Sequence, residues 1–212
     1  MNVILSEIAN AVLDGEAKNI VLLCQKAVAE NVPVADILKK GLIAGMNEVG
    51  ILFKEGEMFV PEVLVSAKTL QYGVDYLSPY LKEAGVEVSG KIITVTVEGD
   101  LHDIGIKLVG MMLEGAGFEV INLGVDRKAA DIIAKVKELK PDILAMSAML
   151  TTTMGKMEEV IALLKQEGLY DQLHVMVGGA PLSPLYAGKI QAHYSADASS
   201  AVTIAKELLN VA

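Results

Sequence analysis

A carboxylate and an imidazole lie two residues apart in this chain, within the pattern Asp100-x-His102-x-x-Gly105. An alternating apolar run precedes the pattern and an amphipathic run follows it, which predicts a loop between a strand and a helix. In open α/β sheets, ligands bind at the carboxyl ends of the strands. Because a carboxylate can orient a metal-ligating imidazole and glycine lets a bulky ligand approach the backbone, the spacing suits a metal-bound ligand at His102.

The composition argues against several classes of function. The 212 residues carry a net charge of -9, so the chain lacks the basic surface that neutralises nucleic-acid phosphates. Cys24 is the only cysteine, which excludes an intrachain disulfide and a thiolate metal cluster. With only three histidines, a multi-histidine metal site is not expected. No apolar run reaches about 18 residues and no signal-like segment is present, so we expect a cytoplasmic protein without a membrane span.

The first half of the chain has helical periodicity only. Pro33 and Pro61 suit the first turns of two helices, whereas Pro79 should kink or end the last helix early. Short connections between helices imply an antiparallel bundle, which we assign to residues 1–88. The four expected helices are a short one closed by Asp14-Gly15 and three at residues 16–30, 33–53 and 61–83.

The second half, residues 89–212, alternates strand and helix patterns after a linker expected at residues 85–90. Such alternation predicts a doubly wound, Rossmann-like α/β domain with a mostly parallel sheet. Asp126 is the expected N-cap of the second helix. The expected strands are residues 91–97, 118–123, 142–147, 174–177 and 192–196, and the expected helices are residues 104–114, 127–139, 154–167 and 198–209.

Two more loops should leave the sheet at the same edge as His102. Hydroxyl groups and small side chains follow the third strand from Ser147 to Thr153, and Gly178-Gly179 follows the fourth. Together they describe a slot suited to the narrow tail of a large ligand. Simpler interpretations remain open, because Thr151–Thr153 can cap the next helix and a double glycine can form a plain turn.

These residues carry a resemblance to a known family. The Asp100-x-His102-x-x-Gly105 motif, the segment from Ser147 to Thr153 and Gly178-Gly179 resemble the cobalamin-binding signature of corrinoid methyl-carrier proteins. The segment from Phe53 to Glu62 resembles the helix-bundle cap of the same family. The resemblance extends to the cobalamin-binding module of methionine synthase, is closer in size to free-standing corrinoid subunits, and covers nearly the whole chain.

The resemblance implies that cobalamin binds base-off, with His102 as the lower cobalt ligand and Asp100 accepting a hydrogen bond from its other ring nitrogen. The nucleotide tail would run beside Ser147, and the hydroxyl of Thr153 would hold Asp100. Asp100 and His102 are the implied catalytic pair, because a change in the number of protons they hold would couple ligation of the cobalt to its oxidation state. The implied cofactor-binding residues are Phe59, Asp100, His102, Asp103, Gly105, Ser147, Met149, Thr151, Thr153, Gly178 and Gly179.

Some implied positions have simpler alternatives or depart from the family pattern. Asp103 can serve as a helix N-cap instead of contacting the cofactor, and Phe59 can be ordinary bundle core instead of covering the methyl group. Met149 stands where a leucine is common, and Thr153 stands where serine is common. The segment Gln191–Tyr194 stands where the family often has a Gly-Ala-Asp run, so the resemblance does not determine which residues form the far end of the nucleotide pocket.

The function implied by the resemblance is methyl carriage between partner enzymes. The donor would be methanol, a methylamine, betaine or an aryl methyl ether, and the acceptor tetrahydrofolate or a thiol. The partners would be a substrate-specific methyltransferase, an acceptor methyltransferase and a corrinoid reductive activator. Alternatives are a mutase subunit, a cobalamin-based regulator or a flavodoxin-like domain without a corrinoid. The sequence does not identify the donor, the acceptor or the oligomeric state.

Overall fold

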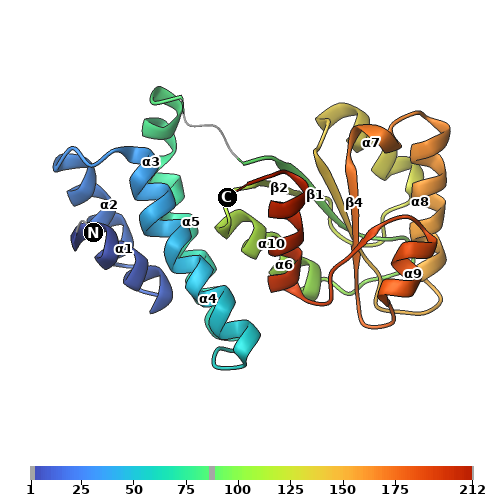
Figure 1. The fold of residues 1–212 in the computed structure, drawn as a ribbon, viewed down its shortest axis with the longest axis horizontal. Coiled ribbons are helices and arrows are strands. Elements are labelled where there is room, and N and C mark those ends of the chain that lie inside the picture. The colour runs from blue at the N-terminus through green and yellow to red at the C-terminus, as the bar shows by residue number, and fades with distance from the viewer. Residues whose placement is uncertain (1–2, 86–88, 212) are drawn as a thin grey trace. The chain divides into compact units, whose positions relative to one another are not determined.

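The structure is a computed structural model that describes residues 3–85 and 89–211. The chain divides into two compact units, residues 1–88 with 114–117, and residues 89–113 with 118–212. In Figure 1 the first unit is made of helices and the second of a sheet with helices. The expected linker at residues 85–90 includes residues 86–88, which lie outside the described part of the chain.

The helical unit contains α1 (Val3–Leu13), α2 (Ile20–Ala29), α3 (Val34–Asp36), the π-helical segment η1 (Ile37–Ile43), α4 (Ala44–Glu55) and α5 (Val60–Glu83). The expected third helix is thus one helical stretch, α3–η1–α4, with a π segment inside it. Gly45 lets this stretch approach α1 closely, because a Cβ there would lie 2.4 Å from the carbonyl oxygen of Ala9. Glycine at this position therefore fixes how tightly the two helices pack.

Of the two outcomes expected for Pro79, the early end of the helix does not occur, because α5 continues through it to Glu83. A proline removes one helical hydrogen bond, but burial of one face can compensate for that loss. Val63, Leu70 and Leu77 of α5 are almost fully buried. Cys24 is also buried, and burial raises the pKa of its thiol to about 11, as expected for a core cysteine.

The second unit holds a five-stranded sheet in the order β2-β1-β3-β4-β5, and each neighbouring pair is parallel. The doubly wound architecture expected from the sequence is confirmed. Aliphatic residues fill β1 and β3, as is typical of strands covered on both faces. The strands are β1 (Lys91–Thr96), β2 (Glu119–Asn122), β3 (Ile143–Ser147), β4 (His174–Gly178) and β5 (His193–Tyr194).

Helices cover both faces of this sheet (Figure 1), and the cluster of buried residues on one face includes side chains from α7 and α8. The short helix α9 was not expected from the sequence, although Ser183 caps it and Pro184 begins it. The helices are α6 (Ile104–Gly115), α7 (Ala129–Leu139), α8 (Met154–Gln166), the 3-10 turn η2 (Tyr170–Gln172), α9 (Pro184–Lys189) and α10 (Ala198–Leu208).

The prediction that Asp126 caps α7 is wrong. Lys128 occupies the N-cap position, and no side chain bonds to the helix end there. Asp126 instead adopts a left-handed backbone conformation, with φ of 53°. Its carboxylate accepts a hydrogen bond from the backbone nitrogen of Gly99. The carboxylate therefore binds the loop after β1 instead of capping the helix.

Among the described residues, no helix combines the length and the apolar character needed to cross a membrane.

Candidate functional site

The strand order reverses direction between β1 and β3, which is where open α/β sheets bind their ligands. The register aligns the ends of the strands, since Thr96 pairs with Ser147 and Ser147 pairs with Gly178. The loops that follow β1, β3 and β4 therefore leave the sheet at one edge. These are the loops that carry Asp100 and His102, Thr153, and Gly179.

Asp100 and His102 form a pair in the loop after β1. The Asp100 side chain is completely buried, whereas the His102 side chain is 55% exposed. Oδ1 of Asp100 lies 2.7 Å from Nδ1 of His102 and 3.1 Å from the backbone nitrogen of His102. The His102 carbonyl in turn accepts a hydrogen bond of 3.0 Å from the hydroxyl of Thr96. Both the ring and the backbone of His102 are thus held by neighbouring groups.

The second oxygen of Asp100 is held by the loop after β3. Oδ2 accepts hydrogen bonds from the backbone nitrogen of Met149, at 2.7 Å, and from the hydroxyl of Thr153, at 2.9 Å. The Thr153 hydroxyl also lies 2.9 Å from the carbonyl oxygen of Leu150. Because one hydroxyl proton serves one acceptor at a time, the charged carboxylate is the favoured partner. The hydrogen bond expected between Thr153 and Asp100 is present.

The protonation state of Asp100 determines which nitrogen of His102 is free. Burial by itself would raise the pKa of the carboxyl group, but hydrogen bonds from Met149, His102 and Thr153 outweigh it and lower the pKa to about 2. An ionised carboxylate only accepts hydrogen bonds, so Nδ1 of His102 is the donor. In the neutral imidazole this leaves the lone pair on Nε2 available to a metal ion.

The lowered pKa of Asp100 predicts a loss of stability in acid. The folded state favours the ionised form, so the stabilisation is present above pH 4, near the ordinary pKa of 3.8, and is lost as the pH falls towards 2. We expect it to be on the order of 1–2 kcal/mol, allowing for some solvent screening. Urea unfolding of the wild type and of Asp100→Asn between pH 6 and pH 2.5 measures it. The difference between their free energies of unfolding should shrink below pH 4. A difference that does not depend on pH would contradict the lowered pKa of Asp100.

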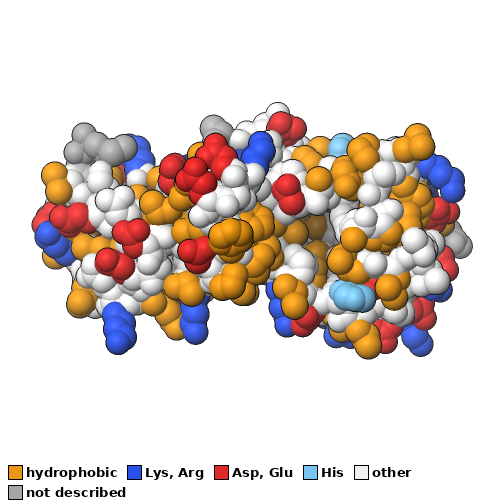
Figure 2. Space-filling view, turned by 90° about the horizontal axis from the view of Figure 1, so that it is seen from below, with side chains coloured by type: hydrophobic (Ala, Val, Ile, Leu, Met, Phe, Trp, Pro, Cys, Tyr) orange, Lys and Arg blue, Asp and Glu red, His pale blue; other side chains and the backbone are white. Residues whose placement is uncertain are grey.

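Exposed hydrophobic side chains surround His102. Leu101 and Ile104 are 73% and 72% exposed, and Met149 and Leu150 at the end of β3 are also exposed. Gly105 has open space where a side chain would stand. Figure 2 shows that hydrophobic side chains are exposed on the face of the molecule that it views. An imidazole set in an apolar surface fits a broad, flat ligand that carries a metal ion at its centre.

Closely packed backbone follows β3 and β4. A Cβ at Gly178 would come within 3.0 Å of the Ser195 carbonyl oxygen and 3.1 Å of its hydroxyl oxygen. At Gly179, whose φ is +135°, a Cβ would lie 1.9 Å from the Ala148 carbonyl oxygen. Ser147, paired with Gly178, is buried. The two glycines therefore let the loops after β3, β4 and β5 pack closely at the place where the ligand tail is expected.

The donor set distinguishes a bare metal ion from a metal-containing cofactor. Within residues 3–85 and 89–211, no group of three or more His, Cys, Asp or Glu side chains could hold a metal ion. His102 can supply one nitrogen ligand, because its Asp100 neighbour is occupied by hydrogen bonds. A metal bound here must bring its remaining ligands with it, as cobalt does in a corrin ring, so the residues fit cobalamin.

Comparison with known proteins agrees with this geometry. Residues 90–203 match the B12 binding domain family, and residues 4–78 match a second family described as a B12 binding domain. The chain belongs to the B12-binding corrinoid proteins. The predicted resemblance and the cobalamin cofactor are thereby confirmed.

Two curated relatives align with this corrinoid protein over 97% of both chains. One, 42% identical, is a corrinoid protein of Desulfitobacterium hafniense strain Y51, and the other, 45% identical, is dimethylamine corrinoid protein 3 of Methanosarcina acetivorans. A solved cobalamin-binding protein from D. hafniense DCB-2 covers 96% of this chain and 98% of its own, with 34% identity and a TM-score of 0.81. The methanol:cobalamin methyltransferase complex of Methanosarcina barkeri covers 100% of this chain and 81% of the matched chain, with 28% identity and a TM-score of 0.88.

Besides Gly105, Ser147, Gly178 and Gly179, three residues named from the sequence do not join the hydrogen-bonded cluster around His102. Asp103 directly precedes α6 and its carboxylate pairs with Lys107, so its contact with the cofactor stays a prediction. Thr151 is exposed in the loop after β3. Phe59 belongs to the helical unit, where it is 67% exposed and therefore is not core, and its backbone nitrogen donates to Glu62. Gly105 lies in the first turn of α6, and the remaining candidates lie at or after the ends of β1, β3 and β4.

Two residues near the site of this corrinoid protein were not expected there. Ser195 follows the two-residue strand β5, and so short a strand gives too weak a pattern to locate the loop after it. Asp126 follows a turn and precedes a helix, which is the sequence context of an N-cap. Only the convergence of the loops in space distinguishes the two possible uses of its carboxylate.

Proposed function

We propose that this corrinoid protein carries a methyl group between a donor-specific methyltransferase and an acceptor methyltransferase. When bound, cobalamin supplies a cobalt centre that takes a methyl group from a donor and releases it to an acceptor. The observation that carries the proposal is an exposed imidazole that is held by a buried carboxylate within an apolar rim. The relatives named as corrinoid proteins and the methanol:cobalamin methyltransferase complex support it.

His102 would provide the lower ligand to cobalt, with cobalamin in its base-off form. Asp100 would keep the proton on Nδ1 and so present Nε2, and it would increase the electron donation of the ring. Because Thr153 and Met149 hold Asp100 from another strand, a change in ligation can be transmitted to the loop after β3. Ser147, Gly178 and Gly179 would receive the nucleotide tail of the cofactor.

The two halves of the chain would have different roles in methyl transfer. Residues 89–212 would bind cobalamin, and residues 1–88 would form the cap that shields the methyl group from water. Phe59 stays the residue predicted to cover the methyl group, and its exposed ring is consistent with contact to something other than its own bundle. The cap must open when a partner enzyme docks, as lids over reactive groups generally do.

The partners follow from the chemistry of a carrier that does not turn over alone. A donor-specific methyltransferase, an acceptor methyltransferase and a reductive activator of the corrinoid would be required. Relatives named for dimethylamine favour a methylated amine as the donor, with methanol, betaine and aryl methyl ethers as alternatives. Tetrahydrofolate or a thiol would accept the methyl group. We also propose that the protein is located in the cytoplasm. No specific observation favours a mutase subunit or a cobalamin-based regulator.

Reconstitution tests the proposal. The full chain is refolded with hydroxocobalamin, and the bound cofactor is quantified by its visible absorption after gel filtration. We expect one cobalamin per chain with a base-off spectrum. After a two-electron chemical reduction of the bound cobalt from Co(III) to Co(I), its methylation should depend on one added methyltransferase, tested in turn with dimethylamine and with methanol. A protein that elutes without cobalamin contradicts the proposal, as does one that binds cobalamin and accepts a methyl group from none of the donor systems.

A further inference from the structure

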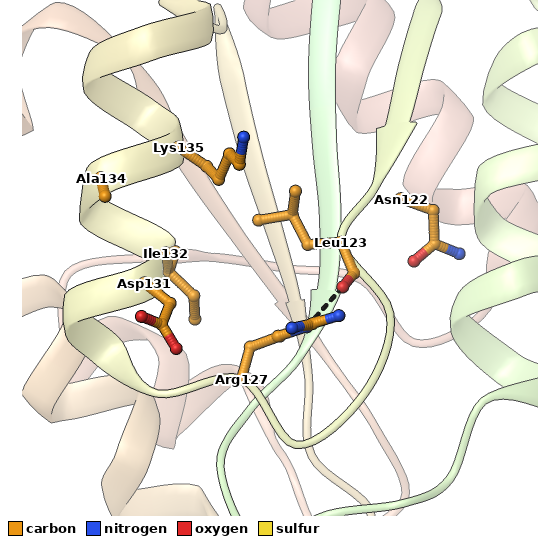
Figure 3. A pocket seen from close by; sticks show the side chains of 7 residues that line it. All are labelled: Asn122, Leu123, Arg127, Asp131, Ile132, Ala134 and Lys135. Carbon is orange, nitrogen blue, oxygen red and sulfur yellow. Dashed lines mark hydrogen bonds between the residues drawn. The ribbon is translucent and has the colours of Figure 1, made fainter.

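The loop between β2 and α7, residues 123–128, is closed by its own side chains. Nε of Arg127 donates to the Leu123 carbonyl oxygen at 2.6 Å, across the base of the loop (Figure 3). The Asn122 side chain accepts a hydrogen bond of 2.7 Å from the backbone nitrogen of Gly124. Both contacts bridge only a few residues, so they restrict the conformations that the loop can adopt.

The same loop is joined to the end of β1. The backbone nitrogen of Thr96 donates to the Gly124 carbonyl at 3.0 Å, and the backbone nitrogen of Arg127 donates to the Thr96 carbonyl at 3.2 Å. Val97 and Arg127 form a parallel bridge. The loop is therefore fixed to the strand from which the segment carrying His102 departs.

Asp126 projects from this closed loop onto that segment. Its Oδ1 accepts a hydrogen bond of 2.7 Å from the Gly99 backbone nitrogen, and its own backbone nitrogen donates to the Asp100 carbonyl at 3.0 Å. Both Gly99, with φ of +81°, and Asp126, with φ of 53°, adopt left-handed conformations. A left-handed aspartate costs conformational energy, so the two hydrogen bonds are needed to keep both turns in place.

The opposite side of the segment is held by α8. Nζ of Lys156 lies 3.3 Å from Oε2 of Glu98, and the Thr153 hydroxyl holds the side chain of Asp100. The segment from Glu98 to Asp100 is thus attached on two sides, and Asp126 supplies the attachment on the β2 side.

We propose that Asp126 is a positioning residue that fixes the Gly99–Asp100 backbone and thereby aims His102 at cobalt. The inference rests on the proposed function, because it needs His102 as the lower ligand. Asp126 itself would touch neither the cofactor nor the methyl group. A ligand imidazole must be held within about half an ångström of its productive place, so loss of one supporting contact lowers ligation without unfolding the domain.

The test uses the full chain loaded with cobalamin and reduced to Co(II), with histidine labelled with ¹⁵N. Electron paramagnetic resonance then reports the fraction of cobalt that carries an imidazole nitrogen. We expect Asp126→Ala to lower the ratio of ligated to unligated cobalt by about tenfold, the effect typical of a partner that orients a ligand. Asp126→Asn keeps an acceptor oxygen and should restore ligation to nearly the wild-type level. Asp131→Ala removes a carboxylate from α7 in the neighbouring pocket of Figure 3 and should leave the ratio unchanged.

A second measurement needs no cofactor. Amide hydrogen exchange in the apo-protein should be faster at Gly99 in Asp126→Ala than in the wild type, while the core of β3 keeps its protection. Wild-type ligation and wild-type exchange in Asp126→Ala would overturn the inference. If the wild type itself binds cobalamin without a nitrogen signal from histidine, the proposed role of His102 fails instead, and the two failures are therefore distinguishable.

Discussion

Replacement of His102 by alanine is expected to remove the imidazole nitrogen signal from protein-bound Co(II) completely. The physical reason is that His102 offers the exposed ring nitrogen at the switch point of the sheet, with its other nitrogen committed to Asp100. Cobalamin affinity should also fall by at least about tenfold, because the apolar rim and the slot remain but the ligand bond is lost. Electron paramagnetic resonance and equilibrium dialysis measure the two effects.

The matched control is His193→Ala, which removes a histidine from β5 of the same unit. It should retain the wild-type nitrogen signal and affinity. Free imidazole added to His102→Ala should restore a nitrogen signal, because the substitution opens space at an exposed position. An unchanged signal in His102→Ala would show that another group ligates the cobalt, and the assignment of the lower ligand would be wrong.

Substitution of Gly178 by valine is expected to weaken cobalamin binding by about 10- to 100-fold, the equivalent of roughly 1–3 kcal/mol of overpacking. A Cβ at Gly178 would lie 3.0 Å from the Ser195 carbonyl oxygen, so a valine there would push the end of β4 and the loop after β5 apart at the place proposed for the nucleotide tail. Cobinamide, a corrinoid without the nucleotide tail, should bind the variant and the wild type within about twofold of each other, since it does not use that space. Competition titrations with both corrinoids measure the difference.

Gly188→Val is the control for the Gly178 substitution. Gly188 lies in α9 with open space where a side chain would stand, so the variant should bind both corrinoids as the wild type does. Circular dichroism shows whether Gly178→Val retains the fold. Equal weakening for cobalamin and cobinamide would mean that the substitution distorts the whole site. Undiminished cobalamin binding would exclude the end of β4 as the place of the tail.

Local patterns were sufficient to predict most of the elements and the centre of the site. Helical periodicity predicted the helices of the first unit, and alternation of strands and helices predicted the parallel sheet. The two exceptions have different physical causes. Pro79 does not end α5, because burial of the helix face outweighs one lost hydrogen bond. The six-residue helix α9 is too short for a periodic signal, although Ser183 and Pro184 mark its start.

The fine structure of the site required the fold. The spacing of Asp100 and His102 predicted their pairing, because two residues this close in one loop can bring their side chains together. By contrast, the backbone nitrogen of Met149 at Asp100 and the carboxylate of Asp126 at Gly99 come from distant parts of the chain. Periodicity contains no signal for such contacts, and the N-cap pattern around Asp126 pointed to a different partner.

The sequence by itself therefore determined the order of the elements, the motif around His102 and the family, since each depends on residues close together in the chain. Only the tertiary structure decided that the backbone of Met149 also holds Asp100, how the glycines after β4 meet Ser195, and what the carboxylate of Asp126 binds. The reason is that the strand order β2-β1-β3-β4-β5 and the register of each pair bring the loop ends together. Pairing between distant strands depends on the packing of the whole domain, and no short segment encodes it.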